Sequence, residues 1–365
     1  MSRVPLVTLP TPPNANAAGW MRYGRGILVS TLAVIVHTAA AAPLADRVEW
    51  FGFAQLTAEH VEQSDHNVGL GSDRVRLGAR WADGAWFGAA QLDFGNGDLS
   101  ERPAGTAPRL VQDAYLGYRF SDSLDVRAGQ FKTPLGMDFH LPGAALDLTK
   151  RGIDNALLLN RAAGVQLGWR EARSGWGMDA GVFAFPGRSG AVRGPNNDPD
   201  GQAGRDFGYA LRVLQDFGEH LHLQGGWGRA EAAGGPGARD YDVFDLAGRY
   251  AAGRLTLKAE IVAGRDLFGT ADRDQQAGYA HAGWQVHPDI ELVLRHYQAR
   301  SDFGGVTRLG NTYIGANFYL GQRRRNGRLQ LNYVVASGHE DDFTGIGGYR
   351  DDALLLQFQV LFDRL

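Results

Sequence analysis

Three features of the amino-acid sequence predict an all-β chain that folds as a transmembrane antiparallel β-barrel of about sixteen strands. Segments of about ten residues alternate apolar with polar or small side chains, the connections between them alternate short and long, and the N-terminus resembles an export signal. Alternation with a period of two is typical of a strand with two different faces. Joined in sequence order, such strands give an up-and-down topology.

The composition favours strands and tight turns. The chain of 365 residues contains 51 glycines and 10 % aromatic residues, and it has no cysteine. An interior glycine costs a helix about 1 kcal/mol relative to alanine, so a helical fold is disfavoured. The lack of cysteine suits a protein exported to an oxidising envelope without disulfides. It also excludes thiol nucleophiles, Cys-based zinc sites and iron–sulfur sites.

The net charge argues against a nucleic-acid partner. The formal charge is −3, and residues 1–42 hold three arginines and no Asp or Glu, so the chain without them carries −6. Domains that bind nucleic acid are normally basic. We therefore expect no nucleic-acid partner.

Residues 1–42 are expected to be an N-terminal signal peptide. Residues 21–25 are basic, residues 27–36 form an apolar segment of the usual length, and the four alanines at 39–42 offer an Ala-x-Ala cleavage site. Cleavage is expected after the second or third of these alanines. The apolar segment is shorter than the ~20 residues that a membrane-spanning helix needs, so a transmembrane anchor is disfavoured.

The start of translation has two candidates. Residues 1–20 are rich in proline and neither apolar nor helical, so Met21 is an alternative initiator. In either case residues 43–365 are expected to form one outer-membrane barrel domain.

The alternation defines sixteen strand segments. In one example Val75, Leu77 and Ala79 share a face, while Arg74 and Arg76 lie on the other. The segments lie near 47–59, 72–82, 85–95, 110–120, 124–131, 162–171, 175–185, 206–217, 220–230, 240–251, 253–264, 276–286, 290–300, 309–320, 327–337 and 352–363.

The connections between these segments are short and long in turn. A transmembrane barrel has short periplasmic turns at one end and longer outer loops at the other. Eight strands fill a barrel with side chains, whereas sixteen to eighteen leave an aqueous channel. The expected activity is therefore passive diffusion of small hydrophilic solutes across the outer membrane.

The longest connection, residues 132–161, is expected to fold inward as the third outer loop. It contains Leu146, Leu148 and the run 157–159 of three leucines, too apolar for a loop in water. We predict that it packs on the inner wall and narrows the pore; an ordinary surface loop that helps subunit packing is the alternative. Its basic residues are Lys132, Lys150, Arg151 and Arg161.

The polar face of the strands is expected to line the pore with basic side chains. Arginine donates two parallel hydrogen bonds to an oxyanion, and rings of Arg and Lys select anions in pores. The candidate pore-lining residues on the strands are Arg74, Arg76, Arg80, Arg119, Arg127, Arg212, Arg249, Lys258 and Arg295.

Carboxylates on the same face are nearly as numerous. Cross-strand pairs that cancel the charge are therefore the alternative to an anion-attracting wall. These carboxylates are Asp73, Asp93, Asp113, Asp125, Asp245, Glu260 and Glu291.

The segment Gly129-Gln-Phe-Lys-Thr-Pro-Leu-Gly136 resembles the Gly-Gln-Phe-Lys-x-Pro signature of the phosphate-selective porin O and P family. Residues 51–53 and 113–116 are similar to that family too, and the resemblance extends over residues 48–365. It implies a trimeric porin of sixteen strands with an anion-attracting lumen, selective for phosphate or polyphosphate in its best-known members. Lys132 occupies the basic position of the signature. Apolar outer faces of the early and late strands would form the contact in a homotrimer.

Other functions remain as alternatives. They are an unselective general porin, a plugged structural or adhesion barrel and, more remotely, a barrel hydrolase of the outer membrane. A hydrolase needs a Ser–His pair on one face, but Ser301 and His296 are five residues apart and fall on opposite faces of one strand. The scattered histidines lack metal-ligand spacing, so we expect no metal and no cofactor.

Overall fold

The computed structural model describes residues 47–62, 68–95, 110–185, 206–231, 239–302, 306–321, 326–338 and 348–363. The predicted signal peptide lies outside these ranges. No helix within them is long and apolar enough to cross a membrane.

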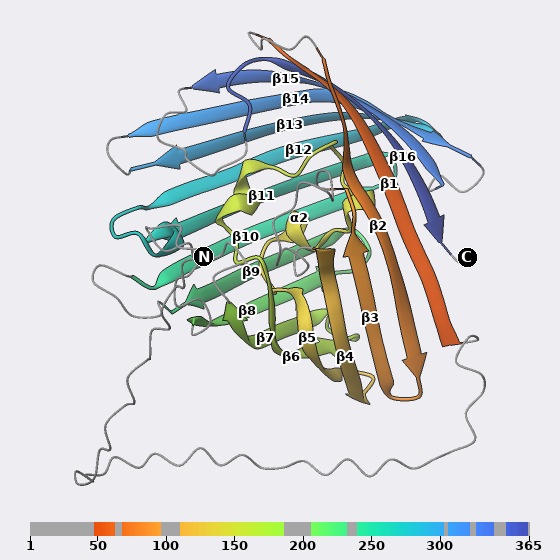
Figure 1. Ribbon diagram of the computed structural model, residues 1–365, viewed down its shortest axis with the longest axis vertical. Coiled ribbons are helices and arrows are strands. Elements are labelled where there is room, and N and C mark those ends of the chain that lie inside the picture. The colour runs from red at the N-terminus through yellow and green to blue at the C-terminus, as the bar shows by residue number, and fades with distance from the viewer. Residues whose placement is uncertain are drawn as a thin grey trace, which may run out of the picture. The chain divides into compact units, whose positions relative to one another are not determined.

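Sixteen antiparallel strands form one closed barrel in sequence order (Figure 1). Every segment predicted from the alternation corresponds to one strand, so the fold prediction is confirmed. The strands are β1 (Val48–Val61), β2 (Gly69–Asp83), β3 (Trp86–Asp93), β4 (Val111–Ser121), β5 (Leu124–Lys132), β6 (Arg161–Glu171), β7 (Trp176–Phe185), β8 (Asp206–Phe217), β9 (Leu221–Ala230), β10 (Tyr241–Ala252), β11 (Leu255–Arg265), β12 (Gln275–His287), β13 (Ile290–Ser301), β14 (Thr307–Leu320), β15 (Gly327–Gly338) and β16 (Ala353–Asp363).

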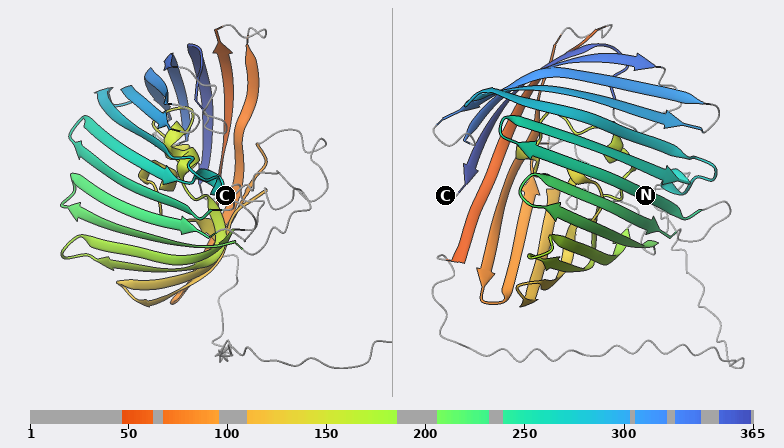
Figure 2. Two further views of the ribbon diagram at one scale, coloured as in Figure 1. Left: turned by 90° about the vertical axis from the view of Figure 1, so that its left-hand side faces the viewer. Right: turned by 180° about the vertical axis from the view of Figure 1, so that it is seen from behind.

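The first strand closes the barrel by pairing on both sides. Phe51 of β1 lies opposite Gly78 of β2 and opposite Asp363 of β16. Closure leaves no strand edge with unpaired backbone groups, which a bilayer would not tolerate. The strands surround a common interior in both further views (Figure 2).

The short turns follow local backbone chemistry. Between β2 and β3 the chain reverses at Gly84, whose φ is +58°. A side chain at this angle would be strained, whereas glycine adopts it freely. The predicted short turn at residues 83–84 is therefore set by its own sequence.

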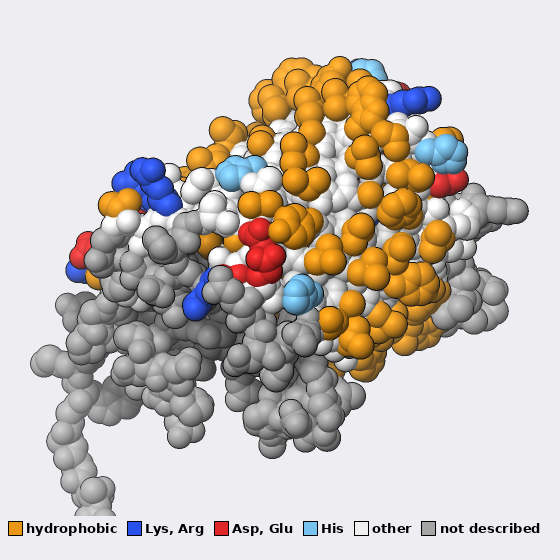
Figure 3. All heavy atoms as spheres, turned by 90° about the horizontal axis from the view of Figure 1, so that it is seen from above, with side chains coloured by type: hydrophobic (Ala, Val, Ile, Leu, Met, Phe, Trp, Pro, Cys, Tyr) orange, Lys and Arg blue, Asp and Glu red, His pale blue; other side chains and the backbone are white. Residues whose placement is uncertain are grey.

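The two faces of the barrel differ as the alternation predicts. On β16 the side chains of Leu354, Leu356 and Phe358 are exposed, while Gln357 and Gln359 are buried. Hydrophobic side chains cover much of one outer face (Figure 3). The apolar face therefore points outward toward lipid and the polar face points into the lumen.

The third outer loop lies inside the barrel, as predicted (Figure 1). Leu146, Leu148 and the leucines at 157–159 are at most 2 % exposed and pack against inward side chains of the wall. We call residues 133–160 the inner loop. Its short helical elements are α2 (Met137–His140), η3 (Gly143–Ala145) and η4 (Ile153–Leu157); a further one, η5 (Leu267–Gly269), follows β11.

Inward polar side chains of the late strands hold the backbone of the inner loop. Arg328 donates to the carbonyl of Leu146 at 2.8 Å, and Gln359 donates to the carbonyl of Ala144 at 3.1 Å. Buried backbone carbonyls need such partners, because an unsatisfied polar group costs about 1–3 kcal/mol. The inner loop is thus fastened to β15 and β16 as well as to its own flanking strands.

The Gly-Gln-Phe-Lys signature forms the point where the chain leaves the wall. Gly129 has a φ of +132°, and a Cβ there would lie 2.2 Å from the carbonyl oxygen of Ala114, so only glycine fits. Phe131 is buried, and Gln130 donates to the carbonyl of Val111 at 2.6 Å. The signature therefore positions Lys132, the last residue of β5, beside the inner loop.

Candidate functional site

Five basic side chains gather between the inner loop and the wall formed by β2, β5 and β6. We call Arg74, Arg76, Lys132, Arg151 and Arg161 the basic cluster. Two of them have carboxylate partners: Arg76 Nε lies 2.8 Å from Asp93 and Arg161 Nε lies 3.0 Å from Asp113. These two pairs are nearly neutral, so the charge of the cluster rests on its other members.

Arg74, Lys132 and Arg151 have only neutral hydrogen-bond acceptors among the described residues. Arg74 donates to the side-chain oxygen of Gln55 at 2.8 Å. Lys132 donates to the carbonyls of Phe139 and Leu141, and Arg151 donates to the carbonyl of Leu141 at 2.5 Å. A carbonyl satisfies a donor without neutralising it, so no paired carboxylate cancels the positive charges of Arg74 and Arg151.

The charge of Asp138 acts on Arg151, and a further carboxylate, that of Asp73, acts on Arg74. Asp73 Oδ2 accepts hydrogen bonds from Thr57 at 2.7 Å and from Gln357 at 2.9 Å. Asp73 thus weakens the positive potential beside Arg74 without forming an ion pair with it. The cluster keeps an excess of positive charge.

The cations of the cluster repel one another. Burial lowers the pKa of Arg151 on the inner loop, and the nearby charges of Arg74, Arg161 and Arg76 lower it further, to about 9. A bound anion would offset both the repulsion among the cations and the hydration that they lose on burial. The arrangement is therefore suited to attract an oxyanion.

Aromatic rings support further arginines on the inner face of the early strands. The guanidinium of Arg80 lies 4.2 Å from the ring centroid of Phe51, and that of Arg127 lies 4.3 Å from the ring centroid of Phe131. Arg119 lies 5.0 Å from the ring centroid of its neighbour Phe87. Such contacts hold a cation in place without neutralising it.

The inward direction of these rings was not predicted from the sequence. Aromatic residues near strand ends are typical of the interfacial girdles of a barrel, and Trp86, Phe120 and Tyr209 are exposed on the outer face. Phe51 and Phe87, however, share the parity of the polar face, as the registers with Gly78 and Gly117 show. Their position in the alternation was the signal that could have placed them on the inner face.

A second group of charges fastens the inner loop to the opposite wall. We call Asp138, Asp147, Lys258 and Arg295 the anchor network. Asp147 lies 2.6 Å from Lys258 Nζ and 2.7 Å from Arg295, and Arg295 also pairs with Asp138. Arg295 is 2 % exposed. Lys258 and Arg295, predicted to face the pore, therefore lie beneath the inner loop.

The other predicted basic residues are dispersed. Arg212 lies 2.5 Å from Asp179, which also pairs with Arg170. Lys150 pairs with Glu59. Arg249 is exposed near the short-turn end of β10, opposite Lys258 in the register. The structure thus brings five of the thirteen candidates together in the basic cluster and places Lys258 and Arg295 together in the anchor network.

The carboxyl of Asp154 on the inner loop is buried near the anchor network. Burial, together with the negative charge of Asp138, raises its pKa to about 7, while Arg295 acts in the opposite direction. Its Oδ1 has no hydrogen-bond partner among the described residues. Near neutral pH this carboxyl therefore passes between its neutral and charged forms in an apolar setting.

We predict that the barrel loses thermal stability as the pH rises from about 4 to about 7 through Asp154. The native state holds the proton more tightly than the unfolded chain does, so raising the pH across this window penalises the native state. Asp154→Asn should flatten that dependence. The measurement is the unfolding midpoint at pH 5 and pH 8 for both proteins, with Asp289→Asn in an exposed turn as the control. An equal slope in the wild type and Asp154→Asn would contradict the assignment.

The pair considered for a hydrolase is separated as predicted. Ser301 is buried on the inner face, whereas His296 is exposed on the outer face and hydrogen-bonds Thr312 at 2.9 Å. Within the described ranges no three His, Asp or Glu side chains are grouped so as to hold a metal ion.

Residues 50–224 match the family described as phosphate-selective porin O and P, as the signature at residues 129–136 predicts. No curated protein matches the sequence.

Solved porin structures are similar in fold. Salmonella typhi OmpF in complex with daunomycin is 13 % identical, with a TM-score of 0.65 over 86 % of this chain and 97 % of that chain. An anion-selective porin from Comamonas acidovorans is 15 % identical, with a TM-score of 0.63 over 86 % and 99 %. The trimer form of OmpT, an outer membrane protein of Vibrio cholerae, is 14 % identical, with a TM-score of 0.58 over 86 % and 99 %.

Proposed function

We propose that this chain, which belongs to the phosphate-selective porin O and P family and lies in the outer membrane, forms a water-filled channel that prefers anions. The observation that carries the anion preference is the basic cluster. Arg74, Lys132 and Arg151 lie together at the inner loop with neutral acceptors only. Small hydrophilic solutes would pass by diffusion, without a chemical reaction.

The position of the basic cluster supports this preference. The inner loop occupies part of the lumen, so an ion that crosses the barrel must pass near it. Low-dielectric walls focus the field of fixed charges into such a passage. Arginine forks also match the oxygens of phosphate, so phosphate and similar oxyanions are the solutes that we propose.

We also propose a homotrimer. The outer faces of β1 and β16 carry exposed apolar side chains, including Trp50, Leu56, Leu354 and Phe358. The register places these two strands side by side, so their apolar residues form one continuous surface. The trimer form recorded for OmpT of Vibrio cholerae is consistent with such an assembly.

The test is electrical. The refolded protein is placed in a planar bilayer across a KCl gradient, the reversal potential is measured, and phosphate is then added. We expect a potential directed by chloride and a current that phosphate reduces. A cation-directed or unselective current would leave a general porin and reject the anion preference.

The remaining alternatives have their own outcomes in the same preparation. No current at all would favour a plugged barrel. The inner-loop leucines pack against the wall, and this packing is the observation that favours that alternative to an open channel. Release of fatty acid from lipid vesicles by the purified protein would favour a hydrolase. We expect current and no hydrolysis.

A further inference from the structure

The outer face of the barrel contains a hollow that the channel function does not use. It has a volume of about 930 Å³ and lies on β9 to β14. Its apolar part includes Leu223, Leu246 and Ile261, around the small residues Gly248 and Ala259. Small residues flanked by large ones leave a depression in the lipid-facing surface, deep enough to hold a hydrocarbon chain.

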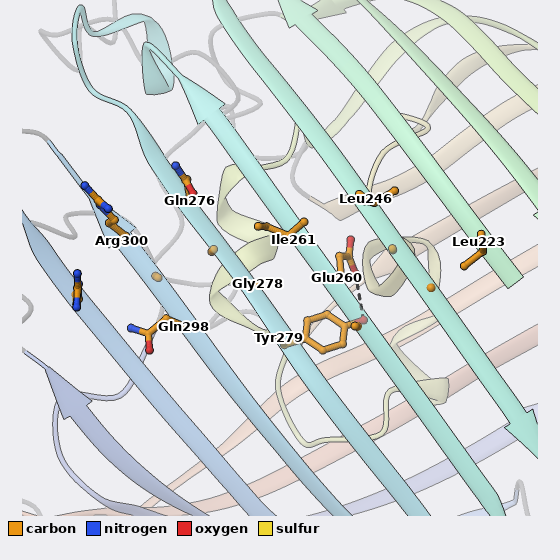
Figure 4. A pocket seen from close by; sticks show the side chains of 15 residues that line it. Leu223, Leu246, Glu260, Ile261, Gln276, Gly278, Tyr279, Gln298 and Arg300 are labelled. Carbon is orange, nitrogen blue, oxygen red and sulfur yellow. Dashed lines mark hydrogen bonds between the residues drawn. The ribbon is translucent and has the colours of Figure 1, made fainter. Parts of the chain in front are cut away.

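One end of the hollow is polar and basic. Gln276, Gln298, Arg300 and Arg308 line it there. Gln276, Gln298 and Arg300 lie at the opposite end from Leu223 and Leu246 (Figure 4). The hollow therefore has the two-part character of an amphiphile: a charged end and an apolar end.

Three of these residues form one row across adjacent strands. Arg300 of β13 lies opposite Gln276 of β12 on one side and opposite Arg308 of β14 on the other. All three side chains are exposed on the outer face. Like charges directly opposite each other in a sheet are destabilising, so the Arg300–Arg308 pair calls for an anion between them.

Nearby carboxylates satisfy this pair only in part. Arg300 Nε lies 2.9 Å from Asp302, and neither terminal amino group of the guanidinium has a partner within the described part of the chain. Arg308 has no polar partner among the described residues. The row therefore keeps donors for a second anion.

The row lies at the outer rim of the membrane. β12 begins at Gln275 after a long connection, and β13 ends at Ser301 before another, whereas the β12–β13 turn is short. Long connections mark the outer end of a barrel. The basic end of the hollow is thus level with the headgroups of the outer leaflet, and the apolar end is level with the acyl chains.

We propose that this hollow binds a phosphorylated lipid of the outer leaflet, with a headgroup phosphate between Arg300 and Arg308 and an acyl chain along the apolar part. The charge complementarity of the row and its position at the rim select this occupant. A second copy of the chain would instead have to bury Arg308 and the partly neutralised Arg300 against its own apolar outer face. This proposal is independent of the solute that crosses the lumen.

The test uses the exported protein in nanodiscs of phosphatidylcholine, titrated with fluorescent diphosphoryl lipid A. Saturable binding is expected for the wild type. Arg300→Gln together with Arg308→Gln should weaken it roughly tenfold or more, because basic residues at the rim attract anionic headgroups. The matched control replaces Arg173 and Arg254, both exposed in short turns at the other end of the barrel, by Gln. Equal binding by the test and control variants would overturn the proposal.

A second variant tests the apolar part without altering charge. Ala259→Trp fills the hollow from its floor and should also weaken lipid A binding, while the channel current stays as in the wild type. Unchanged binding in this variant would overturn the position assigned to the acyl chain.

Two further binding experiments distinguish a lipid phosphate from free inorganic phosphate. Dephosphorylated lipid A should bind weakly, and millimolar inorganic phosphate should not displace the phosphorylated form. Displacement by inorganic phosphate would overturn the lipid assignment. Loss of the oligomer in the Arg300/Arg308 variant, without a change in lipid binding, would assign the hollow to a second copy instead.

Discussion

Replacing Lys132 by Glu should shift the reversal potential of the channel toward cations. The substitution places a negative charge beside Arg151 and Arg161, whose charges act on the same position. At an ion ~8 Å away in water, one unit of charge changes the interaction by ~0.5 kcal/mol, against chloride and in favour of potassium. The ratio of chloride to potassium permeability should therefore fall about fivefold.

Because Lys132 also has a structural role, more than one substitution is needed to separate the effect of charge from the effect of structure. Lys132 Nζ donates to the carbonyls of Phe139 and Leu141, so Glu would also release this part of the inner loop. Lys132→Gln keeps a donor and adds no negative charge, and should give a much smaller shift. If Gln and Glu changed the conductance alike without changing selectivity, the effect would be structural and the electrostatic role would be rejected.

A control on the same loop tests whether position matters. Lys150→Glu makes the same substitution, but Lys150 pairs with Glu59 outside the basic cluster. We expect a clearly smaller shift of the reversal potential. Equal shifts for the two variants would mean that any charge in the lumen acts alike, and would remove the special role of the basic cluster.

Strand positions and faces could be predicted because they depend on local pattern. Alternation assigns Gln357 and Gln359 to the inner face whatever their partners are, and the register bears this out. The inner loop could be predicted as well, because Leu157 and its neighbours cannot remain in water. Both predictions depend only on the local sequence and on the cost of leaving apolar side chains in water.

Charge partners could not be predicted, because they depend on contacts between distant parts of the chain. Arg295 meets Asp138 and Asp147, which lie 157 and 148 residues away in the sequence. Parity alone gave Arg295 and Arg76 the same inward direction. Only the path of the inner loop decides that Arg295 is buried in ion pairs while the basic cluster remains positive.

A bulge explains how two adjacent residues, both predicted to face the pore, do so. The register between β1 and β2 shifts at Gln55 and Leu56, and it omits Asp73. Both Asp73 and Arg74 consequently bond to inward side chains, those of Thr57 and Gln55. Strict alternation would have placed two adjacent residues on opposite faces.

Replacing Asp147 by Asn should release the inner loop from the wall and open the lumen. Asp147 is the shared partner of Lys258 and Arg295, whose side chains are 7 % and 2 % exposed. The pKa of Asp147 lies well below its usual range because these cations outweigh the effect of burial. Leaving buried charges without their partner costs about 3–5 kcal/mol. We expect a lower unfolding midpoint and a larger single-channel conductance.

The charge balance of the anchor network supplies the decisive control. Adding Lys258→Met to Asp147→Asn removes the orphaned ammonium and leaves Arg295 paired with Asp138. The double variant should recover much of the lost stability, whereas Asp83→Asn, at a more exposed ion pair with Arg47, should change little. Conductance reports the position of the inner loop, whereas the unfolding midpoint reports the stability of the barrel. The two measurements therefore distinguish an opened lumen from a destabilised barrel. A lower midpoint with unchanged conductance would show that the loop stays in place without Asp147, and that the hydrogen bonds from Arg328 and Gln359 are sufficient to hold it.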